Sequence, residues 1–259
     1  MKISIVTPSF NQGEFIEEAI QSVLSQGHPD VEHIIVDNCS TDNTAKVLAR
    51  YPHLKVICEP DQGQSDALNK GFRLATGDVI GWLNADDRYL QLCFYNALNA
   101  FAEHQAYDVV YGDYRLVDAQ GEVIRIRKEL GFDLFMLKYL HILYIPTTTS
   151  FFRRRIFQTC HFLNIDYHYA MDYEFFLRLA EGGHRFLHVP KVMADFRWHE
   201  DAKSQKQTGK QDEERERALL THDMFLAGIQ GPLRPVMRFI LMMIARAKRT
   251  VLKLCRGAY

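Results

Sequence analysis

A regular alternation of two kinds of segment over the first 111 residues constrains the fold most. Apolar or β-branched runs, typical of buried strands, occupy residues 3–7, 31–37, 55–58, 79–83 and 108–111. Between them, apolar residues recur at helical spacing, which predicts helices over residues 14–26, 44–50, 65–75 and 92–103. Strands that alternate with helices predict an α/β fold with a mainly parallel sheet flanked by helices. Ligands of such a sheet bind at the carboxyl ends of its strands.

The second half of the chain is less regular. It predicts strands over residues 123–126, 147–152, 186–189 and 192–196, and helices over residues 132–139 and 169–181. Residues 205–210 are polar and predict a linker, which is followed by two expected helices over residues 212–227 and 232–255. We therefore expect an α/β domain over residues 1–204, divided into halves at 1–114 and 115–204, and a helical extension over residues 205–259.

The extension has a strongly uneven charge. The net charge of the chain is −1, but no acidic residue follows Asp223, and seven cations beyond it leave the remainder at −8. On a helical wheel these cations share about half of the circumference. The apolar residues opposite them are Val236, Ile240, Met243, Ile244, Val251 and Leu254, whereas the residues that break the pattern are Leu241, Met242 and Leu252.

A basic amphipathic helix over residues 232–256 is typical of an element that binds an anionic membrane surface. The alternative is a helix whose apolar face packs on the body of the protein or on another subunit. The sequence is therefore also compatible with a homodimer. The five cysteines are odd in number and lack metal-site spacing, which indicates reduced thiols in the cytoplasm. Together these features predict a cytoplasmic, peripheral protein at the inner face of the cytoplasmic membrane.

Three polar clusters fall where predicted strands end. They occupy residues 7–11, 37–44 and 84–87, and the carboxyl ends of parallel strands bring such clusters to one crevice. Asp37 suits the hydroxyl groups of a ribose, and Asp86 suits a divalent cation that neutralises a diphosphate. A glycine-rich phosphate loop is missing, which favours neutralisation by a metal. Taken singly, the second cluster also fits a polar turn and the third an N-terminal helix cap.

Four segments carry a family resemblance: TPSFNQGEFIEEAIQSVLSQ, IIVDNCSTDNT, EPDQGQSDALNKGFRLATGDVIGWLNADD and YAMDYEFFLRLA. In this order and spacing, over about residues 1 to 204, the chain resembles the family 2 inverting glycosyltransferases of the GT-A fold. The resemblance implies a Rossmann-like nucleotide-diphospho-sugar transferase domain. It also implies an enzyme of the hexosyltransferase type that moves a sugar from a nucleoside-diphosphate donor to a hydroxyl group.

The resemblance also implies roles for individual residues on the donor side. Asn84-Ala85-Asp86 occupies the family's Asp-x-Asp position, so Asp86 is expected to bind Mn²⁺ or Mg²⁺, and Asp87 to support it. Asn84 departs from the commonest form and cannot add charge to the metal site. The residues expected to bind the donor nucleotide are Thr7, Pro8, Phe10, Asp37, Gln64, Ser65, Asp66, Asn84 and Ala85.

The remaining expected site residues follow residue 168. Asp172 matches the catalytic base of the family, although an aspartate in the first turn of a helix also fits a simple cap. Residues 196–204 resemble an element that folds over the donor diphosphate. There His199 would complete the metal shell, and Arg197 or Ser204 would contact phosphate. The alternative for His199 is an ordinary surface position beside Glu200 and Asp201.

Other functional classes fit the sequence less well. A Rossmann dehydrogenase would need GxGxxG after the first strand, where TPSFNQG stands instead. A sugar nucleotidyltransferase and a non-catalytic, membrane-docked nucleotide-sugar-binding protein remain as alternatives. The expected partners are a nucleoside-diphosphate sugar, with UDP as the default nucleotide, and a glycan or lipid-linked saccharide acceptor of cell-surface polysaccharide assembly. We expect no nucleic-acid partner.

Overall fold

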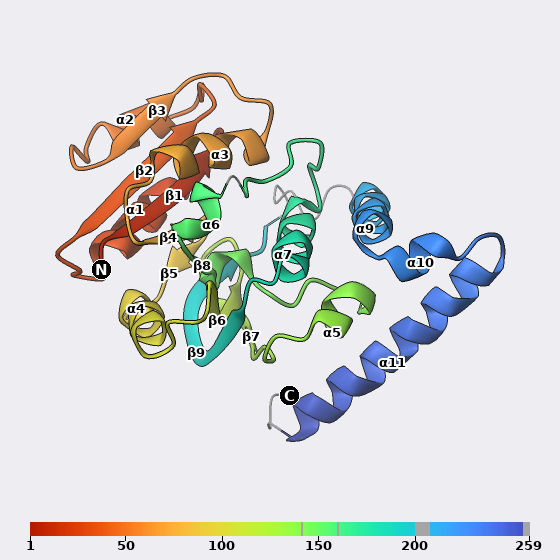
Figure 1. Cartoon of the computed structure of the whole chain (residues 1–259). Coiled ribbons are helices and arrows are strands. Elements are labelled where there is room, and N and C mark those ends of the chain that lie inside the picture. Colours follow the sequence, from red (N-terminus) through yellow and green to blue (C-terminus); the bar gives the residue numbers. More distant parts are fainter. Residues whose placement is uncertain (141, 160, 200–207, 256–259) are drawn as a thin grey trace.

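The computed structural model describes residues 1–140, 142–159, 161–199 and 208–255. Its centre is a nine-stranded mixed sheet with the order β3-β2-β1-β4-β8-β6-β9-β5, and β7 pairs with β6 (Figure 1). The strands are β1 (Ile3–Ser9), β2 (Val31–Asp37), β3 (Lys55–Cys58), β4 (Val79–Trp82), β5 (Arg88–Tyr89), β6 (Val109–Val117), β7 (Val123–Arg127), β8 (Phe151–Arg153) and β9 (Phe186–Arg197).

The first four strands form the parallel part of the sheet. β1 lies between β2 and β4, and β2 pairs with β3, all in parallel. Their carboxyl ends therefore meet at one edge, as the alternation of segments predicts. β8 runs antiparallel to both β4 and β6, and it joins this part to the parallel pair of β6 and β9.

Helices cover both faces of the sheet. They are α1 (Ile16–Leu24), α2 (Thr44–Leu48), α3 (Gln64–Leu74), α4 (Cys93–Glu103), α5 (Leu134–Tyr139), α6 (Arg155–Gln158), α7 (Met171–Glu181), α9 (Thr208–His222), α10 (Met224–Gly228) and α11 (Leu233–Cys255). Successive strand residues point to opposite layers. Thus Ile80 and Phe152 pack with α3 and α7, whereas Val79 and Phe151 pack with α1 and α4.

Several predicted boundaries are wrong in the second half. Residues 147–149 form a 3₁₀ turn, so only 151–153 form a strand. The two strands expected over 186–196 are the single strand β9, whose register with β6 shifts near Pro190. The predicted linker begins outside the described residues, but residues 208–210 already belong to α9. Asp223 divides the helix expected over 212–227, because its carboxylate caps α10 by accepting from the Phe225 amide.

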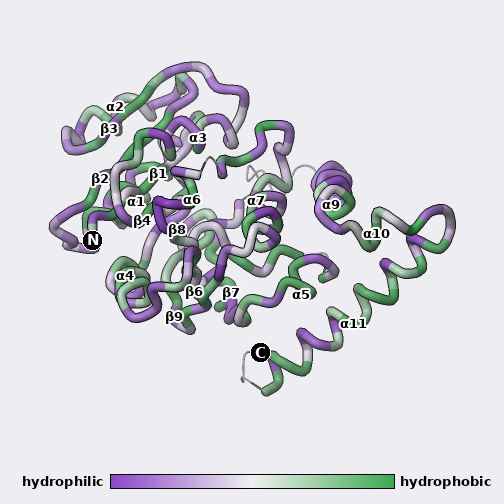
Figure 2. The backbone as a smooth tube through the Cα atoms, in the orientation of Figure 1, coloured by the Kyte–Doolittle hydropathy of each residue, from purple (hydrophilic) through white to green (hydrophobic). Residues whose placement is uncertain are grey.

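The C-terminal helix α11 lies at the periphery of the molecule (Figures 1 and 2). Its cationic face points to the body: Arg238 pairs with Glu216, Lys248 pairs with Asp133, and Lys253 is buried. Burial lowers the pKa of Lys253, and the nearby Glu129 carboxylate partly offsets that effect.

The apolar face of α11 points outward. The residues on this face are between 45% and 65% exposed; they are Leu233, Val236, Phe239, Ile240, Met243, Ile244, Val251 and Leu254. Leu241, Met242 and Leu252, which break the pattern of the helical wheel, are half-buried. They lie on the inward side together with Ala245, which is fully buried. The body-packing alternative for the apolar face is therefore wrong. Within the described ranges, no helix is both long and apolar enough to cross a bilayer.

Candidate active site

A cavity of about 430 Å³ opens at the carboxyl ends of β1, β2 and β4. This volume lies within the usual range for small-molecule sites. Eight of the residues expected at the site line this cavity: Pro8, Phe10, Gln64, Asn84, Ala85, Asp86, Asp172 and Arg197. The structure therefore brings the Asn84-Ala85-Asp86 segment and the expected base together in one cavity, although 85 residues separate Asp86 from Asp172.

Other residues expected to bind the nucleotide lie behind the cavity wall. Thr7 has no exposed surface, and its hydroxyl is 2.9 Å from His33 Nε2. Asp37 is buried, and its carboxylate accepts from the amide and hydroxyl of Ser40 at 2.8 and 2.6 Å. Asp37 thus shapes the loop that places its neighbour Asn38 in the cavity wall.

Ser65 and Asp66 hold the start of α3. The Ser65 hydroxyl donates to the Tyr167 carbonyl at 3.1 Å, which ties α3 to the segment before α7. Asp66 accepts from the Gln62 amide at 3.1 Å and pairs with Lys70 at 3.5 Å. Gln64 reaches the cavity, where its amide donates to Asn84 Oδ1 at 2.9 Å. Ser204 lies outside the described residues.

Asp86 and His199 form a polar pair at the cavity. His199 Nε2 lies 3.1 Å from Asp86 Oδ2, and the Phe15 ring packs against the imidazole with ring centroids 4.9 Å apart. The His199 side chain is only 8% exposed, so it is not the ordinary surface residue of the alternative interpretation. A carboxylate oxygen and an imidazole nitrogen in contact are chemically suited to share one divalent cation.

Asp87 is buried directly behind this pair. Its carboxylate accepts from the Thr148 hydroxyl at 2.7 Å, the Arg197 amide at 2.9 Å and the Asn84 side chain at 3.2 Å. Burial, together with the charge of Asp86, raises the pKa of Asp87 to about 8. Asp87 therefore joins the segment after β4 to the 3₁₀ turn and β9 beneath the cavity floor.

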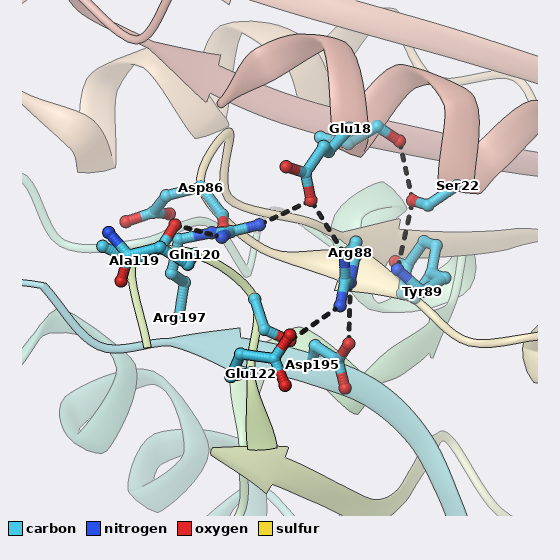
Figure 3. A network of polar contacts seen from close by, with 12 residues as sticks. Glu18, Ser22, Asp86, Arg88, Tyr89, Ala119, Gln120, Glu122, Asp195 and Arg197 are labelled. Atoms are coloured by element: carbon cyan, nitrogen blue, oxygen red, sulfur yellow. Dashed lines mark hydrogen bonds and ion pairs between the residues drawn. The ribbon is translucent and has the colours of Figure 1, made fainter. Parts of the chain in front are cut away.

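The guanidinium of Arg197 is buried and fully engaged in the protein (Figure 3). It donates to the Asp86 carbonyl at 2.9 Å, to Glu18 at 2.6 Å and to the Ala119 carbonyl at 2.7 Å. Glu18 also pairs with Arg88, which reaches Asp195 at 2.7 Å. Arg197 thus ties α1 and the β6–β7 turn to the Asp86 loop, and this geometry gives it a structural task in addition to its place in the cavity wall.

Asp172 lies in the first turn of α7 and faces the cavity. The helix is fixed by its apolar side, because Phe175, Phe176, Leu177 and Leu179 have no exposed surface. One carboxylate oxygen of Asp172 accepts from the Tyr173 amide at 2.8 Å. The half-buried carboxylate therefore has a defined direction while it remains accessible from the cavity.

Comparison with known proteins decides the family. The model of glycosyl transferase family 2 matches residues 4–160, which is more than half of the chain. This chain belongs to glycosyl transferase family 2. It is 39% identical over 92 residues to the putative teichuronic acid biosynthesis glycosyltransferase TuaG of Bacillus subtilis, which covers 34% of this chain and 36% of that protein. The stretches that align with the first two curated relatives make up only 29% and 36% of the length of those proteins.

Two solved structures confirm the GT-A fold of this family 2 protein. TarS of S. aureus (residues 1–349), in complex with UDP-GlcNAc, superposes with a TM-score of 0.70 at 18% identity, over 93% of this chain and 70% of that one. The mannosyltransferase PcManGT of Pyrobaculum calidifontis, in complex with GDP-Man and Mn²⁺, gives a TM-score of 0.62 at 19% identity, over 95% and 73%. The predicted fold class is therefore correct.

Several residues of the cavity wall in this family 2 protein were not predicted from the sequence. Asp61 follows β3, and its position at a strand end was a usable signal. It accepts from the Gly63 amide at 2.8 Å, and burial raises its pKa. His168 and Gln211 also line the cavity, but they come from an irregular segment and from the predicted extension. No local pattern marks either of them.

Proposed function

We propose that this protein is an inverting glycosyltransferase that moves a sugar from a nucleoside-diphosphate donor to an acceptor hydroxyl. The observation that carries the proposal is that Asp86 and Asp172 line one cavity in a family 2 fold. The nucleotide would lie along Pro8, Phe10, Gln64 and Asn84, at the carboxyl ends of the parallel strands. This is where sheets of this type bind their ligands.

Asp172 acts as the general base in this proposal. It takes the proton from the acceptor hydroxyl while that oxygen attacks the anomeric carbon from the face opposite the diphosphate. The bond between the anomeric carbon and the diphosphate oxygen breaks, and the bonding pair leaves with the nucleoside diphosphate. The anomeric configuration is therefore inverted. A positioned base of this kind contributes about 10²–10⁴-fold to the rate.

Asp86 and His199 are the proposed ligands of Mn²⁺ or Mg²⁺. Their 3.1 Å contact at the cavity supports this assignment, as does the Mn²⁺ present in the mannosyltransferase structure. Within the described part of the chain, no group of three or more His, Cys, Asp or Glu side chains is arranged to hold a metal ion. Diphosphate oxygens and water would therefore supply the other ligands. When bound, a divalent cation neutralises negative charge on the departing diphosphate.

The relatives support the proposed classes of donor and acceptor. UDP is the default nucleotide of the donor, because the TarS structure holds UDP-GlcNAc. A GDP-sugar is the alternative donor, because the mannosyltransferase structure holds GDP-Man. The acceptor is a hydroxyl of a glycan or of a lipid-linked saccharide, in the assembly of a cell-surface polysaccharide. The relative named for teichuronic acid biosynthesis supports this assignment.

Helix α11 is the proposed membrane contact of the protein, at the cytoplasmic face of the membrane. Its outward apolar face suits insertion among lipid tails, and Arg246, at an exposed position of the same helix, is available to anionic lipid headgroups. The absence of acidic residues beyond Asp223 favours an anionic lipid surface. Docking there would bring the enzyme close to a lipid-linked acceptor.

The decisive test is a transfer assay with a panel of UDP-, GDP- and TDP-sugars, with and without Mn²⁺ or Mg²⁺. We expect release of the nucleoside diphosphate that requires the cation, and NMR of the product should show an anomeric configuration opposite to that of the donor. Retained configuration would overturn the inverting mechanism. Release of pyrophosphate from a nucleoside triphosphate and a sugar phosphate would instead indicate a nucleotidyltransferase.

A further inference from the structure

Helix α9 holds the segment that leads into α7 by an unusual set of contacts. The Glu214 carboxylate accepts from three consecutive backbone amides: His168 at 3.0 Å, Tyr169 at 2.7 Å and Ala170 at 2.8 Å. These residues directly precede Met171 and Asp172 in the chain. One side chain from a distant helix therefore holds the backbone immediately before the proposed base.

This contact meets a need that the local sequence leaves open. The first amides of a helix lack partners within the helix, and a side chain at the N-cap position usually supplies one. In α7 the N-cap residue is Ala170, whose side chain cannot accept a hydrogen bond. From α9, Glu214 accepts from the N-cap amide of Ala170 and from the two amides that precede it, and its negative charge is also favourable at the positive end of the α7 dipole.

Other residues of α9 hold the same segment. Gln211 Nε2 donates to the Tyr169 carbonyl at 3.0 Å, and Gln211 itself lines the cavity. Arg217 donates to the Asp166 carbonyl at 2.7 Å, and its guanidinium lies 4.1 Å from the centre of the Tyr167 ring. On the other side, Ser65 of α3 holds the Tyr167 carbonyl. Residues 166–170 are thus fixed between α3 and α9.

We propose that Glu214 is a positioning residue, which orients Asp172 by fixing residues 168–170, and that α9 is a part of the active site. The inference rests on the proposed role of Asp172 as the base. Displacement of a reacting group by about 1 Å costs on the order of 10²-fold in rate. Because the nucleotide side of the cavity is built from other elements, the loss of Glu214 should lower turnover and leave donor binding unchanged.

The test compares Glu214→Ala and Glu214→Gln with Glu213→Ala, a matched control at an exposed position of the same helix. For Glu214→Ala we expect kcat per folded molecule to fall by about 10–100-fold, with the donor KM within twofold of wild type. Glu214→Gln keeps an oxygen that accepts hydrogen bonds and should recover part of the loss. Glu213→Ala should behave as wild type. Circular dichroism and thermal melting measure the folded fraction.

A double-mutant cycle with Asp172→Asn separates this inference from the proposed function. If Glu214 acts through Asp172, adding Glu214→Ala to Asp172→Asn should lower kcat by less than twofold further. If the two losses in kcat add fully in the double variant, Glu214 does not act through Asp172 and the positioning role is overturned. The role is also overturned if Glu214→Ala keeps the wild-type kcat, or if its lower activity is explained entirely by the fraction of unfolded protein. Near-normal turnover of Asp172→Asn overturns the base assignment, and with it the premise of the inference.

Discussion

Helices α7 and α11 both carry an apolar stripe, and the protein buries that stripe in only one of them. In α7, Phe175, Phe176 and Leu179 have no exposed surface, and the first turn faces the cavity. In α11, Phe239 and Ile244 are 58% and 51% exposed, while the cations of the opposite face meet Glu216 and Asp133.

The difference shows that amphipathicity identifies the two faces of a helix but does not decide which face is buried. The body of the protein has an excess of acidic residues, and it offers carboxylates where α11 lies. Leu241, Met242 and Leu252, among the cations, add apolar contact on that side. The apolar face of α11 is therefore available for another surface, whereas that of α7 stabilises the domain and aims a carboxylate.

The first turn of α7 carries the largest expected effect. Asp172→Asn removes the proposed proton acceptor and keeps the shape of the side chain, so kcat should fall by about 10²–10⁴-fold while donor affinity is retained. Steady-state kinetics and calorimetric titration with the nucleoside diphosphate measure the two quantities. Asp166→Asn, at an exposed position six residues earlier, is the control. Comparable losses in both variants would contradict a special role for Asp172.

A matched pair of phenylalanines tests the packing difference directly. Phe176→Ala opens a cavity in the core and should lower the free energy of unfolding by about 3–5 kcal/mol. Phe239→Ala, on the exposed face of α11, should change it by less than about 0.5 kcal/mol. Urea denaturation of both variants gives the values. A large loss for Phe239→Ala would mean that this face is buried in solution.

The exposed stripe of α11 should govern membrane binding. The double variant Phe239→Ser/Ile244→Ser should lower binding to phosphatidylglycerol vesicles by at least about tenfold, because two apolar side chains no longer leave water. Val123→Ser/Ile124→Ser, at similarly exposed positions of β7, is the control, and cosedimentation is the measurement. Unchanged vesicle binding, together with loss of a dimer in sedimentation velocity, would assign the stripe to a second copy.

The ion pair between Lys248 and Asp133 carries the smallest expected effect. Both side chains are partly exposed, so Lys248→Ala should lower the free energy of unfolding by less than about 1 kcal/mol. The difference should shrink as salt is raised from 0.05 to about 0.5 M, because salt screens exposed charges. Arg246→Ala, at an exposed position of the same helix, serves as the control. A loss that salt does not reduce would contradict an electrostatic orientation of α11.

Part of the cavity wall was predictable from local pattern. The alternation of segments predicts the parallel strands, and residues at or just beyond the carboxyl ends of these strands reach the cavity, as Pro8, Asn84 and Asp86 do. Asp61 satisfies the same rule and could have been included. The less regular half was predicted less well, because the single strand β9 and the 3₁₀ turn depend on pairing with distant segments.

The sequence by itself determined the class of fold, the family and the segments that meet at the sheet edge, because periodicity and motifs are local properties. Tertiary structure alone decided which face of α11 points outward, where the Arg197 guanidinium donates and how Glu214 holds the start of α7. Each of these depends on a partner dozens of residues away. Such a pairing depends on shape and charge in three dimensions, and no pattern of neighbouring residues encodes it.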